Sequence, residues 1–372
     1  MQPQKIKIII SGGGTGGHVF PAIAIANAII KKCPYAELLF VGANGRLEME
    51  KVPEAGYKIV GLNISGFQRK LTLKNIFVLF KLMSSLQKAK KIIKQFKPDV
   101  VVGVGGYASG PILRIASRKK IPTIIQEQNS YPGITNKILS KKVDKICVAY
   151  NGMDKFFPKD KIYLTGNPVR QDITTLQGKR ERGLELFELD KNKKTVLVVG
   201  GSLGARTINE SIYNDIEKFV QSDIQLIWQT GKLFFETAQQ ACEKYKDFGI
   251  RPTAFISKMD YAYAVADIIV SRAGAIAISE ICLVQKPVIL VPSPNVSEDH
   301  QTKNALALAN YQAAILVKDI EAREILVNKT IELLNNEELC NKLSDNIVQF
   351  AHNNAADIIA DIVLGMVKIN VS

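Results

Sequence analysis

Short apolar runs rich in β-branched residues alternate with longer stretches of helical periodicity along most of the chain. This alternation is typical of βαβ units that wind around a parallel sheet. The pattern predicts strands in the first half at residues 6–10, 38–41, 100–104, 123–126 and 145–148. In the second half it predicts strands at residues 195–199, 224–228, 254–256, 268–270 and 288–291. The predicted fold class is therefore α/β, with two doubly wound parallel sheets.

A break in this pattern separates the two halves. The segment YLTGNPVRQDI, residues 163–173, holds a glycine, an asparagine and a proline in succession, which is typical of a loop or linker. We therefore predict a first domain over residues 1–165 and a second over residues 166–350. Residues 351–372 include a helical pattern after the second sheet is complete, and the pattern alone leaves open which half this helix packs against.

Composition narrows the class of protein. The chain has 372 residues, which suits two domains better than one core. No apolar run approaches the roughly 18 residues of a membrane-spanning helix, and the N-terminus lacks the apolar region of a secretory signal, so a cytoplasmic protein is expected. The cysteines are scattered and never spaced as Cys-x-x-Cys, which predicts neither a disulfide framework nor a structural zinc site. The net charge of +14 indicates an acidic partner, which on charge alone is nucleic acid, anionic lipid or a phosphorylated substrate.

Glycine-rich segments follow predicted strands at residues 11–22 (SGGGTGGHVFPA), 105–111 (GGYASGP) and 200–206 (GGSLGAR). Glycines between a strand and a helix permit a tight turn, and the helix N-terminus offers unpaired N–H groups to an anion. The first segment matches a dinucleotide fingerprint, but the second strand ends in VGAN, without the acid that would bind a ribose. No glycine segment continues into the Gly-Lys-Ser/Thr of a P-loop. Taken together the loops indicate large phosphorylated ligands, whereas each loop by itself is also compatible with a packing role.

His18 ends the first glycine segment, at the predicted start of a helix. The positive end of the helix dipole favours the neutral imidazole there. A neutral imidazole suits a general base or a hydrogen-bond partner of phosphate. A histidine that merely caps the helix is the alternative.

The segment SRAGAIAISE, residues 271–280, repeats the strand-to-helix arrangement in the second half. Arg272 and the nearby backbone amides are suited to a diphosphate, and Glu280 is suited to accept hydrogen bonds from ribose hydroxyls. A solvated Glu280 is the alternative. The chain lacks an Asp-x-Asp motif, so we predict no metal clamp and assign no metal ligand. Amides and arginines, among them Arg170 and Arg206, would then bind the diphosphate.

Residues 67–97 contain nine basic residues and no acidic one, among many apolar residues. Lys74, Lys81 and Lys88 recur every seven residues, near one helical face, and the apolar positions cover more of the circumference than one core-facing stripe needs. Such a helix is suited to docking on an anionic membrane surface without spanning it. A core helix with a solvated lysine face and a nucleic-acid-binding helix are the alternatives. The chain shows no stacking motif or recognition-helix pattern, which argues against nucleic acid.

The following segments occur in this order along the chain: GGTGGHVFPA, GGYASGP, QEQNSYPG, GNPVR, GGSLGAR, SRAGAIAISE and EDHQTKNA. Together they resemble the motif set of the MurG family, bacterial N-acetylglucosaminyltransferases that convert lipid I to lipid II in peptidoglycan synthesis. The resemblance implies a GT-B fold of two Rossmann-like domains, with the lipid-linked acceptor on the first and UDP-N-acetylglucosamine mainly on the second. It also implies that residues 351–372 return to the first domain, that no cofactor is used, and that the enzyme is peripheral at the cytoplasmic face of the membrane.

The resemblance also implies site residues, which we place by the matching motifs. His18 is predicted as the catalytic base, with Glu127 as the second candidate. The implied acceptor-binding residues are Gly14, His18, Tyr107 and Asn129. The implied donor-binding residues are Thr15, Gly16, Gly17, Asn129, Arg170, Ser202, Ile256, Arg272, Ala275, Ile276, Glu280 and Gln301. Among these, Ile256 would contact uracil through its backbone and Glu280 would bind the ribose.

The implied reaction is an inverting single displacement, in which the C4 hydroxyl of N-acetylmuramic acid attacks C1 of the donor sugar as UDP departs. Members of the family often carry a hydroxyl residue where this sequence has Ala277, so no side-chain contact to the donor is expected from that position. Two kinds of alternative stay open. One is another GT-B enzyme, such as a UDP-sugar epimerase or a transferase with a different acceptor. The other is a non-catalytic, membrane-associated binder of nucleotide sugars.

Overall fold

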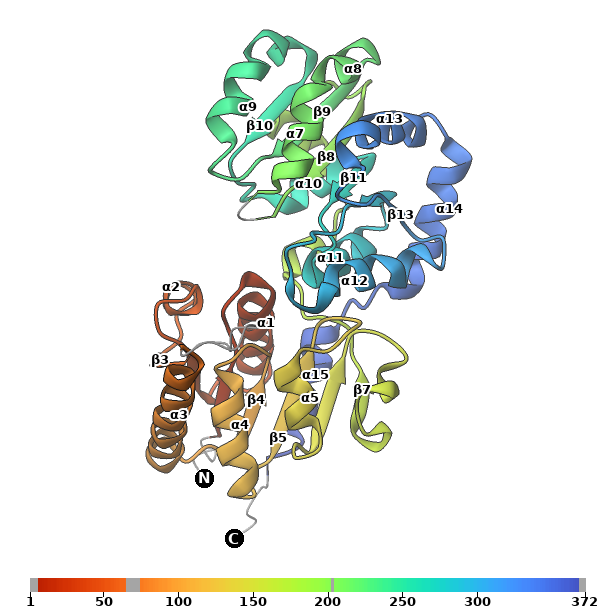
Figure 1. Ribbon diagram of the computed structural model, residues 1–372. Coiled ribbons are helices and arrows are strands. Elements are labelled where there is room, and N and C mark those ends of the chain that lie inside the picture. Colours follow the sequence, from red (N-terminus) through yellow and green to blue (C-terminus); the bar gives the residue numbers. More distant parts are fainter. Residues whose placement is uncertain (1–5, 65–73, 202–203, 368–372) are drawn as a thin grey trace. The chain divides into compact units, whose positions relative to one another are not determined.

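The computed structural model describes residues 6–64, 74–201 and 204–367 (Figure 1). Contacts between residues divide the chain into two units. Unit 1 comprises Met1–Val169 together with Asn354–Ser372, and unit 2 comprises Arg170–Asn353. The boundaries predicted after residues 165 and 350 lie a few residues earlier. Each unit holds one sheet of parallel strands flanked by helices, which confirms the predicted fold class.

Unit 1 contains a seven-stranded parallel sheet in the order β3-β2-β1-β4-β5-β6-β7. Its strands are β1 (Lys7–Ser11), β2 (Glu37–Ala43), β3 (Ile59–Leu62), β4 (Val100–Gly103), β5 (Thr123–Glu127), β6 (Lys145–Val148) and β7 (Ile162–Leu164). Every strand predicted for this half is present. The pattern does not predict β3 and β7, because these edge strands have only four and three residues and show too little periodicity.

The side chains of β1 alternate between two cores of unit 1. Ile8 and Ile10 pack on the face covered by α1 (Gly16–Lys32) and α15 (Ala355–Leu364), whereas Ile9 packs on the face covered by α3 (Lys74–Phe96) and α4 (Ser109–Arg118). Burial on both faces explains why this strand is an unbroken apolar run and not an alternating one. The other helices of unit 1 are α2 (Glu48–Glu54), α5 (Ile134–Ser140) and the 3₁₀ turns η1 (Met153–Lys155) and η2 (Lys159–Lys161).

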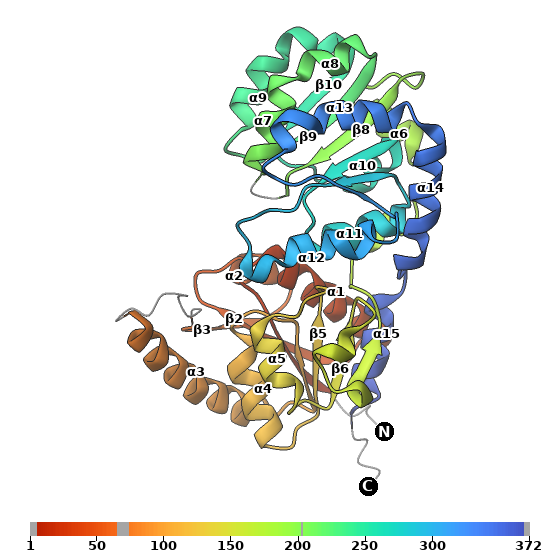
Figure 2. The ribbon, with the colours of Figure 1, turned by 45° about the vertical axis from the view of Figure 1, so that its right-hand side comes forward.

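The last helix, α15, packs on α1 (Figure 2). Ile359 and Val363 are fully buried in the core that also holds Ile25 of α1. At the edge of this contact, Lys32 Nζ lies 2.6 Å from Asp361 Oδ1. The final helix therefore belongs to unit 1, a question that the helical pattern of the sequence left open.

Unit 2 contains a six-stranded parallel sheet in the order β10-β9-β8-β11-β12-β13. Its strands are β8 (Lys194–Val199), β9 (Ile224–Gln229), β10 (Ile250–Thr253), β11 (Ile268–Ser271), β12 (Val288–Leu290) and β13 (Ile315–Leu316). The strand predicted at residues 254–256 is wrong, because the strand ends at Thr253 and those residues form the next loop. Arg251 and Pro252 interrupt the apolar pattern of β10, so the sequence does not predict this strand. The strand lies at the edge of the sheet, where a proline is tolerated.

Helices pack around this second sheet. They are α6 (Arg180–Leu186), α7 (Arg206–Asn214), α8 (Ile216–Gln221), α9 (Phe235–Cys242), α10 (Met259–Val265), α11 (Ala275–Val284), α12 (His300–Ala309), α13 (Ala322–Leu334) and α14 (Glu337–Ile347). The 3₁₀ turns are η3 (Gln171–Ile173), η4 (Glu243–Phe248), η5 (Ser297–Asp299) and η6 (Val348–Phe350). Trp228 is fully buried in the core and donates its indole N–H to Asn209 Oδ1 at 3.1 Å. Within the described residues, no helix has the length and apolar character needed to cross a membrane.

All five cysteines are free thiols. Burial raises the pKa of Cys147, Cys242 and Cys282 to about 12, so these thiols stay protonated at neutral pH. Cys33, Cys147, Cys242 and Cys282 are buried, whereas Cys340 is partly buried.

The buried contact of α15 with α1 predicts a stability effect. Ile359→Ala removes a fully buried side chain and should lower the free energy of unfolding by about 2–5 kcal/mol. The control is Ile358→Ala, because this neighbour in the same helix is 42% exposed. Urea unfolding measures both variants, and equal effects would show that α15 contributes little through its buried face.

Candidate active site

His18 lies in the first turn of α1, directly after the glycine loop that follows β1. Thr15 precedes the helix in an extended conformation, and its carbonyl accepts the N–H of His18 at 3.1 Å. The hydroxyl of Thr15 lies 3.3 Å from His18 Nδ1, so this side chain helps to orient the ring. The imidazole is partly buried at the positive end of the helix, the environment that the sequence predicts.

A second glycine loop, after β4, lies directly against the first. Gly105 and Gly106 have φ angles of +92° and +79°, a region that favours glycine. A Cβ atom on Gly106 would collide with the carbonyl oxygen of Gly13, and one on Gly105 would lie 2.5 Å from Cδ2 of His18. Two of the predicted glycine loops therefore meet within unit 1, and their contact requires glycine.

Two predicted acceptor residues lie beside this contact. Tyr107 is half-exposed, next to the second loop. Gly14 is exposed, but its N–H donates to Glu48 Oε2 at 2.8 Å, so this amide is not available to a phosphate. Glu48 is not among the site residues that the sequence motifs predict. Its helix also holds Glu50 and Glu54, which are exposed, and nothing in the local pattern distinguishes the buried acid from them.

Glu127, the last residue of β5, is buried and accepts four hydrogen bonds from the loop that follows it and from α5. Oε1 accepts from N and Nδ2 of Asn129 at 3.0 and 3.1 Å. Oε2 accepts from Gly133 N at 3.1 Å and from Asn136 Nδ2 at 2.8 Å. Burial raises the pKa of Glu127, and these donors oppose the rise. With both oxygens occupied, Glu127 is better suited to holding Asn129 in place than to receiving a proton from a substrate.

In unit 2, a pocket of about 690 Å³ opens at the carboxyl ends of β8, β11 and β12. Ligand sites commonly have roughly 300–1,000 Å³. The glycine loop before α7 and the first turns of α11 and α12 line the pocket, and with them the predicted donor residues Arg272 and Gln301. Ala277 also lines it. Ser202, another predicted donor residue, lies outside the described residues.

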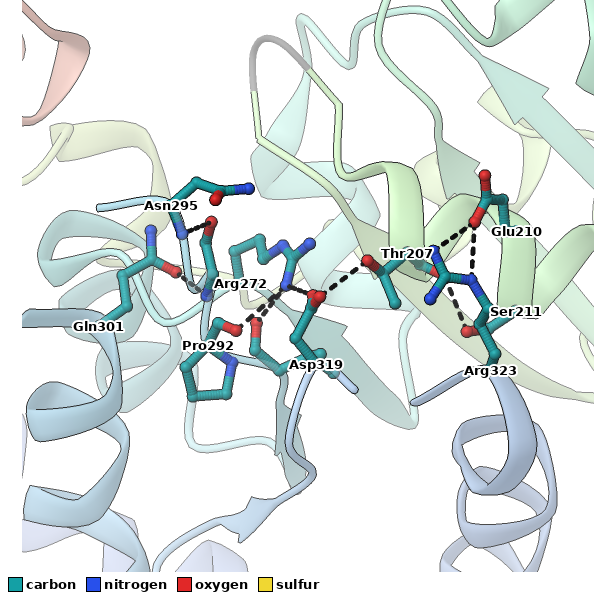
Figure 3. Close-up of polar contacts among 11 residues, drawn as sticks. Thr207, Glu210, Ser211, Arg272, Pro292, Asn295, Gln301, Asp319 and Arg323 are labelled. Carbon is teal, nitrogen blue, oxygen red and sulfur yellow. Dashed lines mark hydrogen bonds and ion pairs between the residues drawn. The ribbon is translucent and has the colours of Figure 1, made fainter. Parts of the chain in front are cut away.

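Arg272 is partly a structural residue of this pocket (Figure 3). Its Nη1 donates to the carbonyl oxygens of Val291 and Pro292 at 3.1 and 3.2 Å, and to Asp319 Oδ1 at 2.5 Å. Asp319 Oδ2 accepts from the hydroxyl of Thr207 at 2.9 Å. Asp319 thus links the loop after β11 to the first turn of α7. Nε and Nη2 of Arg272 are the donors left for an anion.

The other polar groups of the pocket are also mainly donors. Gln301 Oε1 accepts the N–H of Ser293 at 2.9 Å, which leaves its Nε2 for a ligand. On another side of the pocket, Glu210 bonds Arg206 at 2.6 Å and Arg323 at 2.6 Å, and these two arginines lower its pKa. Arg323, in the first turn of α13, is not among the site residues that the sequence motifs predict. These walls suit an anion such as a diphosphate.

No group of three or more His, Cys, Asp and Glu side chains in the part of the chain that the structure describes is arranged to hold a metal ion.

Glu280, in the middle of α11, is 7% exposed, so the alternative of a solvated side chain is wrong. Its Oε1 accepts from Arg170 Nε at 3.1 Å, and its Oε2 accepts from the hydroxyl of Tyr263 at 3.1 Å. Burial raises the pKa of Glu280, and Arg170 is the main opposing influence. The structure brings the two predicted donor residues together, but it pairs them with each other.

The remaining predicted residues lie at loops and helix starts. Gly16 and Gly17 form the first turn of α1, and Ala275 and Ile276 form that of α11. Ile256 lies in the loop after β10, where its N–H donates to Gln229 Oε1 at 3.4 Å. The carbonyl group of Ile256 is the backbone group left for a contact to uracil.

Comparison with known proteins identifies the family. Residues 8–148 match the glycosyltransferase family 28 N-terminal domain, and residues 195–362 match the C-terminal domain of the same family. The chain is 56% identical over 358 residues to a UDP-N-acetylglucosamine–N-acetylmuramyl-(pentapeptide) pyrophosphoryl-undecaprenol N-acetylglucosamine transferase of Parabacteroides distasonis, covering 96% of this chain and 97% of the relative. The chain belongs to this transferase family.

Solved structures agree with that assignment. MurG of Acinetobacter baumannii superposes with a TM-score of 0.77 at 27% identity, over 97% of this chain and 99% of the other. A UDP-GlcNAc 2-epimerase of Neisseria meningitidis has a TM-score of 0.64 at 16% identity, over 97% of this chain and 100% of the other, and this shows a shared fold alone. The protein is a glycosyltransferase of the MurG family with the GT-B fold. The alternatives of an epimerase and of a non-catalytic binder are thereby set aside.

The role of Asp319 in this transferase predicts a stability effect. Asp319→Ala leaves the donors of Arg272 and Thr207 without their acceptor, at a cost of about 1–3 kcal/mol or more in unfolding free energy. Glu321→Ala is the control, because the side chain of that neighbouring acid forms an exposed ion pair with Lys318. Urea unfolding of both variants is the measurement. An Asp319 variant as stable as the Glu321 variant would show that Asp319 does not hold the pocket together.

Proposed function

We propose that the protein transfers N-acetylglucosamine from UDP-N-acetylglucosamine to the C4 hydroxyl of the N-acetylmuramyl unit of lipid I, with inversion at C1. The observation that carries the proposal is the 56% identity to a transferase with this donor and acceptor in its name, over nearly the whole chain. The paired glycine loops around His18 and the donor-rich pocket of unit 2 support it chemically. The oxygen of the acceptor forms a bond to C1, and the bond from C1 to the diphosphate oxygen breaks.

In this proposal His18 is the general base. The proton of the attacking hydroxyl passes to the imidazole, which later releases it to solvent. The hydrogen-bond distance to Thr15 and the contact with Gly105 give the ring a defined orientation, which a base requires. Glu127 is the weaker candidate, because its oxygens already accept four hydrogen bonds.

The proposed acceptor contacts come from the loops of unit 1. Gly14 and Thr15, in the loop before α1, and Gly16 and Gly17, in its first turn, would meet the acceptor and the donor sugar. Tyr107 is exposed enough to pack against a sugar. Asn129, which Glu127 holds, would contact both sugars through its side chain.

The proposed donor contacts come from unit 2. The leaving diphosphate gains negative charge, which Arg272, Gln301 and the amides at Ala275 and Ile276 would stabilise without a metal. Ser202, by its motif, belongs to the same set. Ile256 would contact uracil.

The ribose contact requires an exchange of partners. Ribose hydroxyls would bond Glu280, and this carboxylate now accepts from Arg170 and Tyr263. In the proposed complex the side chain of Arg170 turns from Glu280 to the diphosphate. This movement frees Glu280 for the ribose and gives the diphosphate a cation.

His18→Ala tests the base. We expect turnover to fall by about 100-fold or more, since general base catalysis typically contributes 10²–10⁴-fold, while the affinity for UDP holds. The assay measures transfer from labelled UDP-N-acetylglucosamine to a short-chain lipid I analogue in the presence of a chelator. His352→Ala is the control, because this histidine lies outside the proposed site. Wild-type turnover in the His18 variant would remove it from the role, and no transfer by the wild-type protein would reject the acceptor.

We also propose that the enzyme is peripheral at the cytoplasmic face of the membrane, and that α3 contacts anionic lipid. Phe80 and Met83, one turn apart, are 69% and 55% exposed beside exposed Lys81. Apolar side chains flanked by cations suit an anionic bilayer surface. Lys88 fits this role less well than predicted, because its Nζ donates to the carbonyl of Gly61 at 2.7 Å. The residues before 74, and the side chain of Lys74, lie outside the described part of the stretch.

A double variant tests this membrane contact. Replacing Phe80 and Met83 by Glu removes apolar area and adds negative charge, so binding to vesicles with phosphatidylglycerol should fall by more than about tenfold. Vesicles of phosphatidylcholine alone test the charge dependence. Leu233→Glu is the control, because Leu233 is an apolar residue of unit 2 that is even more exposed, at 95%. Unchanged vesicle sedimentation of the double variant would argue that this face is only solvated.

A further inference from the structure

Glu48 is a buried acid in unit 1 that the proposed reaction does not use. It begins α2 and is 1% exposed. Its Oε2 accepts the N–H of Gly14 at 2.8 Å, and its Oε1 accepts the N–H of Ala43, at the end of β2, at 2.8 Å. No ion pair engages this carboxylate within the described chain. The two backbone N–H groups therefore stabilise this buried carboxyl group. Burial of a carboxyl group is costly without such hydrogen bonds, so both N–H groups have to stay in place.

Two glycines make room for this acid. A Cβ atom on Gly13 would collide with Oε1 of Glu48, and one on Gly42 would collide with its Cγ. Gly13 belongs to the loop that leads to His18, and Gly42 belongs to β2. The acid thus packs directly against the loop and against the neighbouring strand, with no space for another side chain between them.

The same loop is enclosed by the loop after β4. Gly106 approaches the carbonyl of Gly13, and Gly105 approaches the ring of His18. The segment between β1 and α1 is therefore held by the hydrogen bond that Gly14 donates to Glu48 and by close contacts with the second glycine loop. A displacement at Gly14 has to reach Thr15 and His18, because the helix starts two residues after Gly14.

We infer that Glu48 is a positioning residue for His18, which acts through the N–H of Gly14. The inference rests on the proposed function of His18 as the base. Both partners of Glu48 are donors, so the site needs two acceptor oxygens. Glu48→Gln would place an NH₂ group against one of the two N–H groups and push the loop out of place. The loop then serves to orient the base, and the amide of Gly14 does not bind phosphate.

Turnover measured in two backgrounds tests the inference. Glu48→Gln should lower kcat by about 10- to 100-fold, the effect of a misplacement of about 1 Å, while KM for the donor stays within about twofold. Rates are divided by the number of UDP-binding sites, so that misfolded protein does not count. In the His18→Ala background the same change should cause little further loss, because the group that it positions is gone. Equal losses in both backgrounds, or no loss in wild type, would overturn the inference.

Glu50→Gln is the matched control, because Glu50 lies in the same helix but pairs with Lys51 at the surface. Glu48→Asp keeps the charge with a shorter side chain and should lose less turnover than Glu48→Gln. If Glu48→Gln fails to fold, Glu48→Asp supplies the same test in both backgrounds.

NMR of the imidazole side chains separates this inference from the role of His18. The chain has only three histidines, and His18→Ala assigns the signal of His18. In Glu48→Gln the signal of His18 should shift, while those of His300 and His352 stay. A fixed His18 signal, or equal shifts of all three signals, would overturn the positioning role. This result holds whether or not His18 proves to be the base.

Discussion

Parallel pairing in register is the constraint on which the candidate site residues of each unit depend. Ser11 of β1 pairs with Gly103 of β4, and Val199 of β8 pairs with Ser271 of β11. Because paired parallel strands end at the same edge of a sheet, the loops that follow them begin side by side. These loops lead to His18 in one unit and contain Arg272 in the other. The buried faces of the strands hold this register, since a slip by one residue would turn every side chain of β1 to the opposite core.

Loops that begin so close together meet a second constraint, the space between backbones. Glycine resolves it where Gly106 meets Gly13, and carboxylates that are buried or partly buried accept hydrogen bonds from the donors nearby. Glu48, Glu127 and Asp319 each accept at least two hydrogen bonds from the segments around them. Burial of an acid is costly without such partners, so the loss of either the acid or its donors should destabilise the loops that they join. These acids are therefore best understood as supports of the functional loops.

The two units offer different chemistry to a reaction. The pocket of unit 2 presents arginine, amide and helix N-terminal donors, and such groups stabilise charge that develops on a departing diphosphate. The glycine loop of unit 1 instead has the carboxyl group of Glu48 behind it, which already accepts the N–H of Gly14. The pairing of Arg170 with Glu280 couples two residues that we propose to contact the UDP-sugar, since the arginine competes with a ribose hydroxyl for the same carboxylate.

The sequence by itself determined the α/β class, most strands, the glycine loops and, through its ordered motifs, the family. These are local signals, because the period of a strand and the conformation of a glycine turn depend on residues a few positions apart. The partners of the functional groups were decided by the tertiary structure alone. Glu48 reaches Gly14 across 34 positions, Asp319 reaches Arg272 across 47, and Tyr263 reaches Glu280 across 17. Nothing in a local pattern tells which acid of a charged helix will be buried. The sequence pattern of α15 likewise shows an apolar face but does not show that α1 covers it. An amphipathic pattern indicates that one face is buried, and the tertiary structure decides which element packs against that face.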